Sequence, residues 1–446
     1  MIGRIAMARR EMLALGLTGM PLLSACAQRV EAPGVRQRRG PSTIVWTSWA
    51  TDDLGKNRVQ EQADLFMQEY PGITIDIQNY PSSGYLDKVI ALLAAGTGPD
   101  VFRANPNSAI GMLDHVQELD GLLAKEKGTW WGSKDVKPGV MDWGRYRGKM
   151  LGFPMGTGAY YAFHVNKDLF DKAGLPYPPE KYNDPSWTFD RVLELAKALT
   201  VRSSDGVAEQ LGIDRGMSWS FLHPVVMSWG GDYFDENTGE FKWHEPVATD
   251  AIQWMADLLH KHRVAPTPEE ARAGVGNFVN GKLAIRWSTF NLAMYLINDV
   301  GERFRWDVAP PPRFGARPPR LWFYVSWWVL NRGTRNLEDA FLFDYWVSGP
   351  KGERVSVEYA WSIPHFYSLD AKLGLRMGQK KNLTVALDCL NYVAKSRPEL
   401  NRGYDEAMRV LGPALARVAN GETTAKQAMQ QIKPEMDRLL RAGLER

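Results

Sequence analysis

The sequence has 446 residues, of which 44% are hydrophobic, so it can bury more than the single core that chains of up to about 250–300 residues usually form. Its 54 lysines and arginines nearly balance its 51 aspartates and glutamates, and the formal net charge is +3. This balance gives no electrostatic reason to expect binding to nucleic acid. We therefore expect two lobes and no nucleic-acid partner.

The first 25 residues have the composition of an export signal. Arg4, Arg9 and Arg10 precede the apolar run 12–17, and small residues follow it before Cys26. The apolar run is too short to cross a bilayer of about 30 Å as a helix. We predict that residues 1–25 are a signal peptide and that the mature chain, with a formal net charge of +1, is exported.

Residues 23–26, Leu-Ser-Ala-Cys, resemble the lipobox of bacterial lipoproteins. The resemblance implies cleavage before Cys26, acylation of its sulfur by palmitate or a similar chain, and a periplasmic or cell-surface protein held to the membrane by this lipid alone. Residues 9–13 also resemble a twin-arginine motif, although Ala8 replaces the usual Ser or Thr, so both export routes stay open. Cys389 is then the last free thiol, and its apolar surroundings predict a buried, inert residue without a disulfide.

Beyond the signal, residues 26–42 contain few apolar side chains and predict a lipidated flexible tether. The next segments alternate in the order strand 44–46, helix 59–70, strand 73–77, helix 86–93 and strand 100–102. This alternation predicts right-handed crossovers and a mainly parallel sheet. Ligands of such sheets bind beyond the carboxyl ends of the strands, so loops 47–53 and 103–107 are expected to line a site.

Several segments resemble, in the same order, motifs of the family 1 extracellular solute-binding proteins, which include maltose-binding-protein-like sugar-binding lipoproteins. Residues 93–101 resemble the turn A-A-G-x-x-P-D-V, and residues 163–175 resemble Y-N-K-D-L-F-x-x-A-G-L. Residues 185–189 resemble a helix start of the family, with Thr188 as the expected N-cap. Further matches follow at 278–285, 336–341 and 361–364.

The resemblance implies an α/β fold of the periplasmic-binding-protein type. Two discontinuous lobes, each with a central mainly parallel sheet flanked by helices, are joined by a hinge. The expected boundaries are 43–158 plus 311–358 for the N-terminal lobe and 159–310 plus 359–446 for the C-terminal lobe. The implied function is that of a monomeric, non-enzymatic binding component, which closes on its ligand and delivers it to the membrane subunits of an ABC importer.

Aromatic residues give the main indication of the ligand. The chain has 17 tryptophans, and aromatic rings pack on the apolar face of a sugar while polar side chains bind its hydroxyl rim. We predict a mono- or oligosaccharide. The expected ligand-binding residues lie in loops, at strand ends or at lobe crossings: Trp49, Asp52, Asn105, Tyr160, Trp229, Asp232, Arg286, Trp287 and Trp361.

The sequence contains no complete catalytic or metal-binding motif, so no catalytic residue, metal or cofactor is expected. Residues 276–282 fit G-x-x-x-x-G-K, but Leu283 stands where a phosphate loop needs Ser or Thr. His260 and His262 are two residues apart and point to different faces of a helix. Two alternatives stay open: an exported glycosidase or lyase, whose paired carboxylates need only be close in space, and a binding protein for a polyol phosphate or a polyamine.

Overall fold

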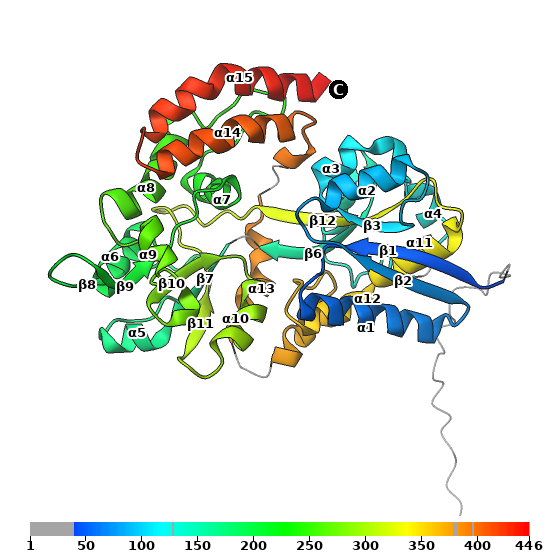
Figure 1. Cartoon of the computed structure of the whole chain (residues 1–446), viewed down its shortest axis with the longest axis horizontal. Helices are drawn as coiled ribbons and strands as arrows, with labels where there is room; N and C mark the ends of the chain where they lie inside the picture. Colours follow the sequence, from blue (N-terminus) through cyan, green and yellow to red (C-terminus); the bar gives the residue numbers. More distant parts are fainter. Residues whose placement is uncertain (1–39, 127–128, 160, 378–380, 395–396, 446) are drawn as a thin grey trace, which may run out of the picture. The chain divides into compact units, whose positions relative to one another are not determined.

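The computed structural model describes residues 40–126, 129–159, 161–377, 381–394 and 397–445. The predicted signal peptide, Cys26 and most of the predicted tether lie outside these residues. The described chain is a mixed α/β structure built on two five-stranded sheets (Figure 1). No helix in the described ranges is both long and apolar enough to span a bilayer.

The first sheet has the strand order β2-β1-β3-β12-β6. Neighbours β2, β1 and β3 are parallel, as the alternation of strands and helices predicts, and β12 is antiparallel to both β3 and β6. Its strands are β1 (Ser42–Ser48), β2 (Ile73–Asn79), β3 (Val101–Ala104), β6 (Phe153–Ala159) and β12 (Phe323–Leu330). The short ribbon β4 (Arg145–Tyr146) and β5 (Lys149–Met150) precedes β6.

The helices of the N-terminal part cover this sheet with apolar faces. Val59, Ala63 and Phe66 of α1 are buried at helical spacing and share one cluster with Ile44 and Trp46 of β1. The helices associated with the sheet are α1 (Asp53–Glu69), α2 (Tyr85–Ala94), α3 (Pro106–Gly111), α4 (Asp120–Leu123), α11 (Leu337–Val347) and α12 (Pro350–Glu358).

The second sheet has the order β11-β7-β10-β9-β8, and its pairing differs from the mainly parallel sheet expected. Only β9 and β10 pair in parallel, whereas β7 is antiparallel to both of its neighbours. The strands are β7 (Ala162–Asn166), β8 (Val201–Arg202), β9 (Ala208–Ile213), β10 (Leu283–Ser288) and β11 (Trp306–Ala309). The helices around it are α5 (Lys167–Lys172), α6 (Phe189–Leu199), α7 (Trp219–Trp229), α8 (Pro246–His260), α9 (Pro268–Arg272) and α10 (Leu292–Val300).

The chain passes between the sheets without an intervening helix, and this explains the antiparallel pairs that β7 and β12 form. Strand β6 of the first sheet ends at Ala159 and β7 of the second sheet begins at Ala162. Strand β11 of the second sheet likewise leads to β12 of the first. A strand that enters a sheet directly lacks the crossover helix that makes neighbouring strands parallel. The lobe boundaries themselves stay a prediction.

Two local predictions are confirmed. Thr188 is the N-cap of α6, and its hydroxyl oxygen accepts the N–H of Arg191 at 3.1 Å. Cys389 is fully buried, and burial raises the pKa of its thiol well above the usual range. A thiol that stays protonated and inaccessible is a poor nucleophile.

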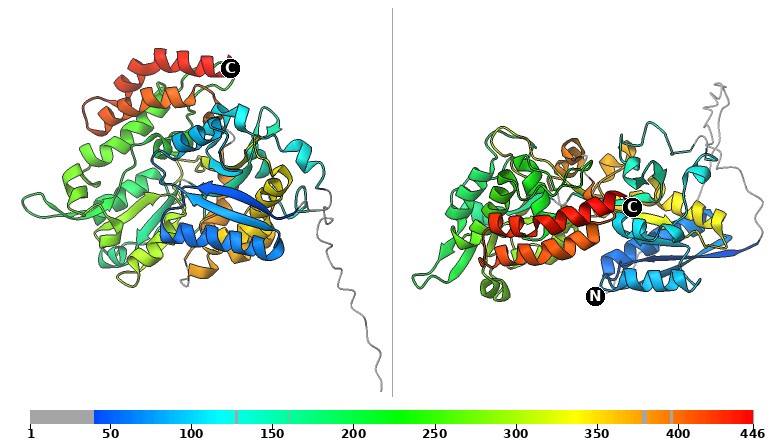
Figure 2. Two further views of the ribbon diagram at one scale, coloured as in Figure 1. Left: turned by 45° about the vertical axis from the view of Figure 1, so that its right-hand side comes forward. Right: turned by 90° about the horizontal axis from the view of Figure 1, so that it is seen from above.

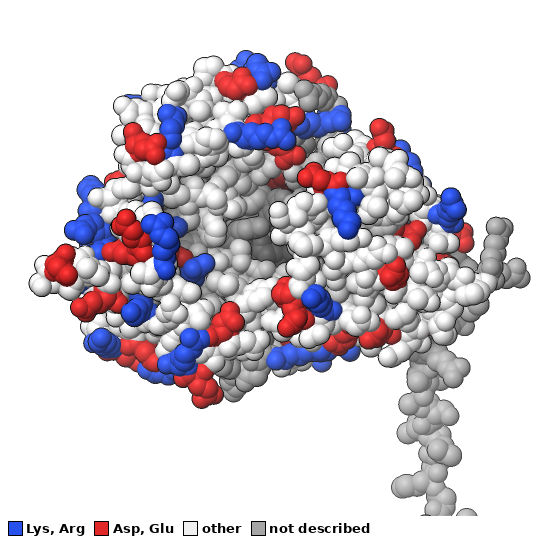
Figure 3. Space-filling model, in the orientation of Figure 1, with Lys and Arg blue, Asp and Glu red and all other residues white. Residues whose placement is uncertain are grey.

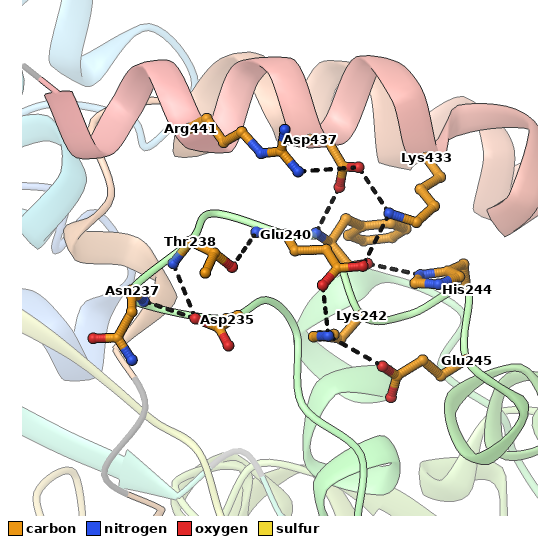
Figure 4. Close-up of polar contacts among 11 residues, drawn as sticks. Asp235, Asn237, Thr238, Glu240, Lys242, His244, Glu245, Lys433, Asp437 and Arg441 are labelled. Carbon is orange, nitrogen blue, oxygen red and sulfur yellow. Dashed lines mark hydrogen bonds and ion pairs between the residues drawn. The ribbon is translucent and has the colours of Figure 1, made fainter.

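The C-terminal segment consists of α13 (Thr384–Asp388), α14 (Tyr404–Ala419) and α15 (Ala425–Glu445), and the last two lie side by side (Figure 2). Helix α15 is fastened to the turn at 235–240 by charged groups (Figure 4). Asp437 accepts the backbone N–H of Phe241 at 2.8 Å, and Lys433 bridges Asp437 at 2.7 Å and Glu240 at 3.3 Å. These contacts tie the end of the chain to the second-sheet side of the molecule.

Candidate functional site

The loops after β1 and β3 carry a first group of predicted site residues. The half-buried ring of Trp49 packs edge-on against Tyr85, with the ring centres 5.0 Å apart, and the guanidinium of Arg103 lies over it at 3.7 Å. Arg103 donates to the hydroxyl of Ser326 at 3.1 Å, and that hydroxyl donates to Asn105 at 3.2 Å. The network therefore joins the carboxyl ends of β1 and β3 to the neighbouring strand β12.

Asp52 has two roles at this edge. It is the N-cap of α1, where its carboxylate accepts the N–H of Gly55 at 2.8 Å. The same carboxylate acts through space on the hydroxyl of Tyr295, which belongs to α10 on the second-sheet side. Partial burial, together with Asp52, raises the pKa of Tyr295 to about 12. A polar contact thus connects elements of the two sheets.

We expect Tyr295→Phe to weaken this contact selectively, because it removes the hydroxyl and leaves the ring in place. The variant lacks the polar group that connects the two sides, so the ligand-free protein should expand in small-angle scattering. Tyr177→Phe is the matched control, because the hydroxyl of Tyr177 also interacts with an aspartate, Asp171, but both residues belong to the segment around α5. Equal scattering profiles of the two variants would show that the Asp52–Tyr295 contact does not hold the two sides together.

Trp361 lies next to a buried arginine of α1. The centre of its ring is 4.8 Å from the guanidinium of Arg58. Arg58 Nη1 donates to the side chains of Gln62 at 3.2 Å and Ser356 at 3.1 Å, which fastens α1 to α12. Burial lowers the pKa of Arg58 to about 10, while Tyr295 and Asp52 act on it through space in the opposite direction.

The second sheet carries a separate group around the ends of β9 and β10. Asp214 accepts the backbone N–H of Trp287 at 2.7 Å and forms an ion pair with Arg286 at 3.0 Å. Burial raises the pKa of Asp214 to about 6, and Arg286 opposes this shift. Asp232 lies at the surface near α7, and partial loss of hydration raises its pKa. Asp214 and Arg286 thus form a charged pair at the carboxyl edge of the parallel pair of strands.

The two remaining tryptophans belong to an aromatic cluster on the same side. Trp229 stacks on Phe314 with the ring centres 4.1 Å apart, and it is half-buried. Trp287 is only 1% exposed, and Tyr161 and Phe163 pack against its ring at 4.8 Å and 4.7 Å. In this conformation the ring of Trp287 is a core element that no ligand can reach, because its surroundings are already filled.

The predicted residues therefore form two groups, one on each side of the candidate site, and we call these groups its two walls. Trp49, Asp52, Asn105 and Trp361 meet through Arg58, Arg103, Tyr295 and Ser326. Trp229, Asp232 and Arg286 lie on the second-sheet side, and Trp287 is buried in the core of that side. Tyr160 lies outside the described residues. Between the elements of the two sheets the face in Figure 3 is hollowed. Sequence reasoning missed Asp214, Arg58 and Tyr295. Asp214 directly follows β9, so the expectation that ligands bind beyond the carboxyl ends of strands could have identified it. Arg58 and Tyr295 lie within helices, where the sequence gives no such indication.

Solved structures share this arrangement of sheets and helices. The ABC substrate-binding protein from Listeria monocytogenes in complex with cycloalternan is similar with a TM-score of 0.74 at 19% identity, over 89% of this chain and 98% of that one. The maltose-bound MalE3 of T. maritima has a TM-score of 0.71 at 21% identity, over 90% and 100% of the two chains. The fold is that of the periplasmic-binding-protein class, which confirms the fold class predicted from the sequence.

The sequence comparison gives the family. Residues 50–354 match the bacterial extracellular solute-binding protein family, and the chain belongs to this family. Among curated relatives, the erythritol/L-threitol-binding protein of Mycolicibacterium smegmatis is 24% identical over 397 residues, which are 79% of this chain and 80% of that protein. The described residues contain no group of three or more His, Cys, Asp or Glu side chains that could hold a metal ion.

Proposed function

We propose that this protein is the substrate-binding component of an ABC importer and captures a small polyhydroxylated ligand, a sugar or a polyol, between the two walls described above. The observation that carries the proposal is the polar network that links Asp52 on the first-sheet side to Tyr295 on the second. Relatives named for erythritol/L-threitol, cycloalternan and maltose support a hydroxylated ligand. Export through the signal at 1–25, a lipid anchor at Cys26 and a monomeric state belong to the same proposal.

The proposed mechanism is closure of two lobes over the ligand. Indole rings on both walls provide apolar surface for a sugar ring, and the carboxylates and guanidiniums beside them provide directional hydrogen bonds. A ligand shifts the equilibrium only through contacts that it makes better in the closed state than in the open state. Bridging between the Trp49 side and the Trp229 side supplies such contacts, and the closed form then docks on the membrane subunits.

A thermal-shift screen of sugars and polyols against the mature chain tests this proposal. A ligand that binds only the folded state stabilises it by mass action, by about 2.7 kcal/mol at a concentration one hundred times its Kd. We expect at least one sugar or polyol to raise the melting temperature and to compact the protein in small-angle scattering. Hydrolysis of a glycoside by the purified protein would instead support the alternative that the protein is a glycosidase.

Trp229→Ala is expected to weaken binding of that ligand by about 1 kcal/mol or more, because an exposed part of an indole ring provides stacking area for a sugar face. Trp254→Ala is the matched control: Trp254 is also half-buried and its ring lies 6.4 Å from that of Trp229, but it is not among the proposed site residues. Isothermal titration calorimetry measures both variants. If the two affinities fall equally, Trp229 acts through the aromatic cluster and does not contact the ligand.

A further inference from the structure

Arg58 is a buried cation with unused hydrogen-bond donors. Its side chain is 2% exposed, although it belongs to the second turn of α1, close to the edge where Asp52 caps the helix. Nη1 is satisfied by Gln62 and Ser356. Within the described part of the chain, Nε and Nη2 have no hydrogen-bond partner. Buried polar groups normally have partners, so two unused donors on one charged group need an explanation.

The two unused donors lie on one edge of the guanidinium. The Nε–H and Nη2–H bonds of arginine are parallel, and this pair matches the spacing of two oxygens of a carboxylate or a phosphate. The edge is also held in place, because Nη1 is bonded on the other side and the ring of Trp361 lies 4.8 Å away. The geometry is that of a prepared bidentate donor without an acceptor. Because both nitrogens are covered in this conformation, an anion can bind them only in a conformation that uncovers this edge.

The charges around Arg58 do not satisfy its unused edge. Asp52 acts on Arg58 through space, and its carboxylate accepts the N–H of Gly55. Arg103 acts, as Arg58 does, on the hydroxyl of Tyr295 through space. The charge of Arg58 is therefore buried while two of its donors have no partner among the described residues, which is costly. A neutral hydroxyl can accept one hydrogen bond here, whereas an anion satisfies both donors and adds a counter-charge, and a polyamine would be repelled.

We infer that the ligand of this protein carries one anionic group, a carboxylate or a phosphate, and that the Nε–Nη2 edge of Arg58 binds it with electrostatic help from Arg103. This inference rests on the proposed function and specifies it: the ligand is an acidic sugar or polyol. The ring of Trp361, 4.8 Å from the guanidinium of Arg58, helps to keep the plane of that group in position.

Matched neutral and acidic compounds test the inference by calorimetry on the mature protein. The pairs are glucose and glucuronate, erythritol and erythronate, and glycerol and glycerol 3-phosphate, so that the carboxylate and phosphate arms are separate. We expect the acidic member of at least one pair to bind at least tenfold more tightly than its neutral partner, and this preference to decrease as the NaCl concentration rises. The salt series needs no variant and therefore does not depend on how a substitution folds.

Arg58→Met removes the charge and retains much of the apolar bulk, and it is expected to abolish the preference for the acidic member. Arg58→Lys keeps the charge without the bidentate edge and is expected to retain only part of it. Arg191→Met, on the surface of α6, is the control and should bind like the unmodified protein. Binding of neutral members alone, or an acidic preference unchanged in Arg58→Met, would overturn the inference and leave the proposed function intact. No binding of either member, together with no response to any other sugar or polyol in the thermal-shift screen, would contradict both.

Discussion

Glu353→Gln is expected to raise the free energy of unfolding by several kcal/mol at pH 8–9, the largest pH-dependent effect that we predict. Glu353 is buried in α12, where one carboxyl oxygen accepts the backbone N–H of His365 at 3.0 Å and the hydroxyl of Ser362 at 3.3 Å. The second oxygen has no partner among the described residues. Burial raises the pKa of Glu353 to about 8, although the hydrogen bonds from His365 and Ser362 oppose the shift.

The sign follows from proton counting. In the unfolded chain Glu353 loses its proton near its ordinary pKa of 4.5, whereas the folded protein keeps it up to about 8. Between these two values the folded state binds one proton more than the unfolded state. The contribution of Glu353 to stability therefore falls with rising pH by about 1.4 kcal/mol per unit and levels off above pH 8. The amide of glutamine is neutral throughout and has no such penalty.

Urea denaturation of the wild type and of Glu353→Gln at several pH values from 4.5 to 9 measures this effect. The two proteins should be similar in stability near pH 4.5 and diverge as the pH rises. Both proteins share a residual pH dependence from other buried groups: burial raises the pKa of Asp344 and lowers the pKa of His164, His223 and His365 to about 3. Glu338→Gln, at an exposed position of α11, is the control and should run parallel to the wild type. If the stability of Glu353→Gln changed with pH in the same way as that of the wild type, Glu353 would be ionised in the folded protein.

Trp46→Ala should destabilise the protein by about 3–5 kcal/mol, the usual cost of replacing a fully buried Trp or Phe by Ala. Trp46 is 1% exposed in β1, and its ring lies 5.0 Å from each of the rings of Trp328 and Phe343. Its indole N–H has no partner in the described part of the chain, so the cost comes from lost apolar contact and from the cavity, not from a broken hydrogen bond. Trp46→Phe should cost less, because a second aromatic ring fills part of the space.

Equilibrium unfolding followed by circular dichroism checks this value. Trp131→Ala is the control: Trp131 packs at the edge of the same cluster and is half-buried, so a smaller loss is expected. The burial of Trp46 agrees with its place in an apolar strand. A loss below about 1 kcal/mol for Trp46→Ala would show that the core of the first sheet closes around the missing ring.

Much of the local structure could be predicted because it depends on neighbours in the chain. The alternation at 73–77 and the helical spacing at 59–70 agree with β2 and α1, and Thr188 caps α6 as its type and position indicate. The prediction of a mainly parallel second sheet was wrong. The chain passes directly from β6 to β7 without a helix, and this makes β7 antiparallel to its neighbours. The composition of the two strands does not indicate how they are connected.

The candidate site was harder to predict, because the same residue type has different roles at different depths. Trp287 lies near the end of β10 and Trp49 follows β1 directly, yet Trp287 is buried among aromatic rings and Trp49 lies at an edge under Arg103. No sequence pattern distinguishes an indole ring with free surface from one that is fully covered. Arg58 gives no signal at all, since an arginine in the second turn of an amphipathic helix is usually solvated.

The sequence by itself determined the α/β class, the family and the loops that follow the strands of the first sheet. These features depend on short-range periodicity and on ordered motifs. Only the tertiary structure decided which tryptophans keep free surface, that Asp52 meets Tyr295 across the two sheets, and that Arg58 is buried with an unused edge. These contacts join residues separated by as many as 303 positions, as Arg58 and Trp361 are, and the packing of whole elements, not the local chain, sets the distance between them.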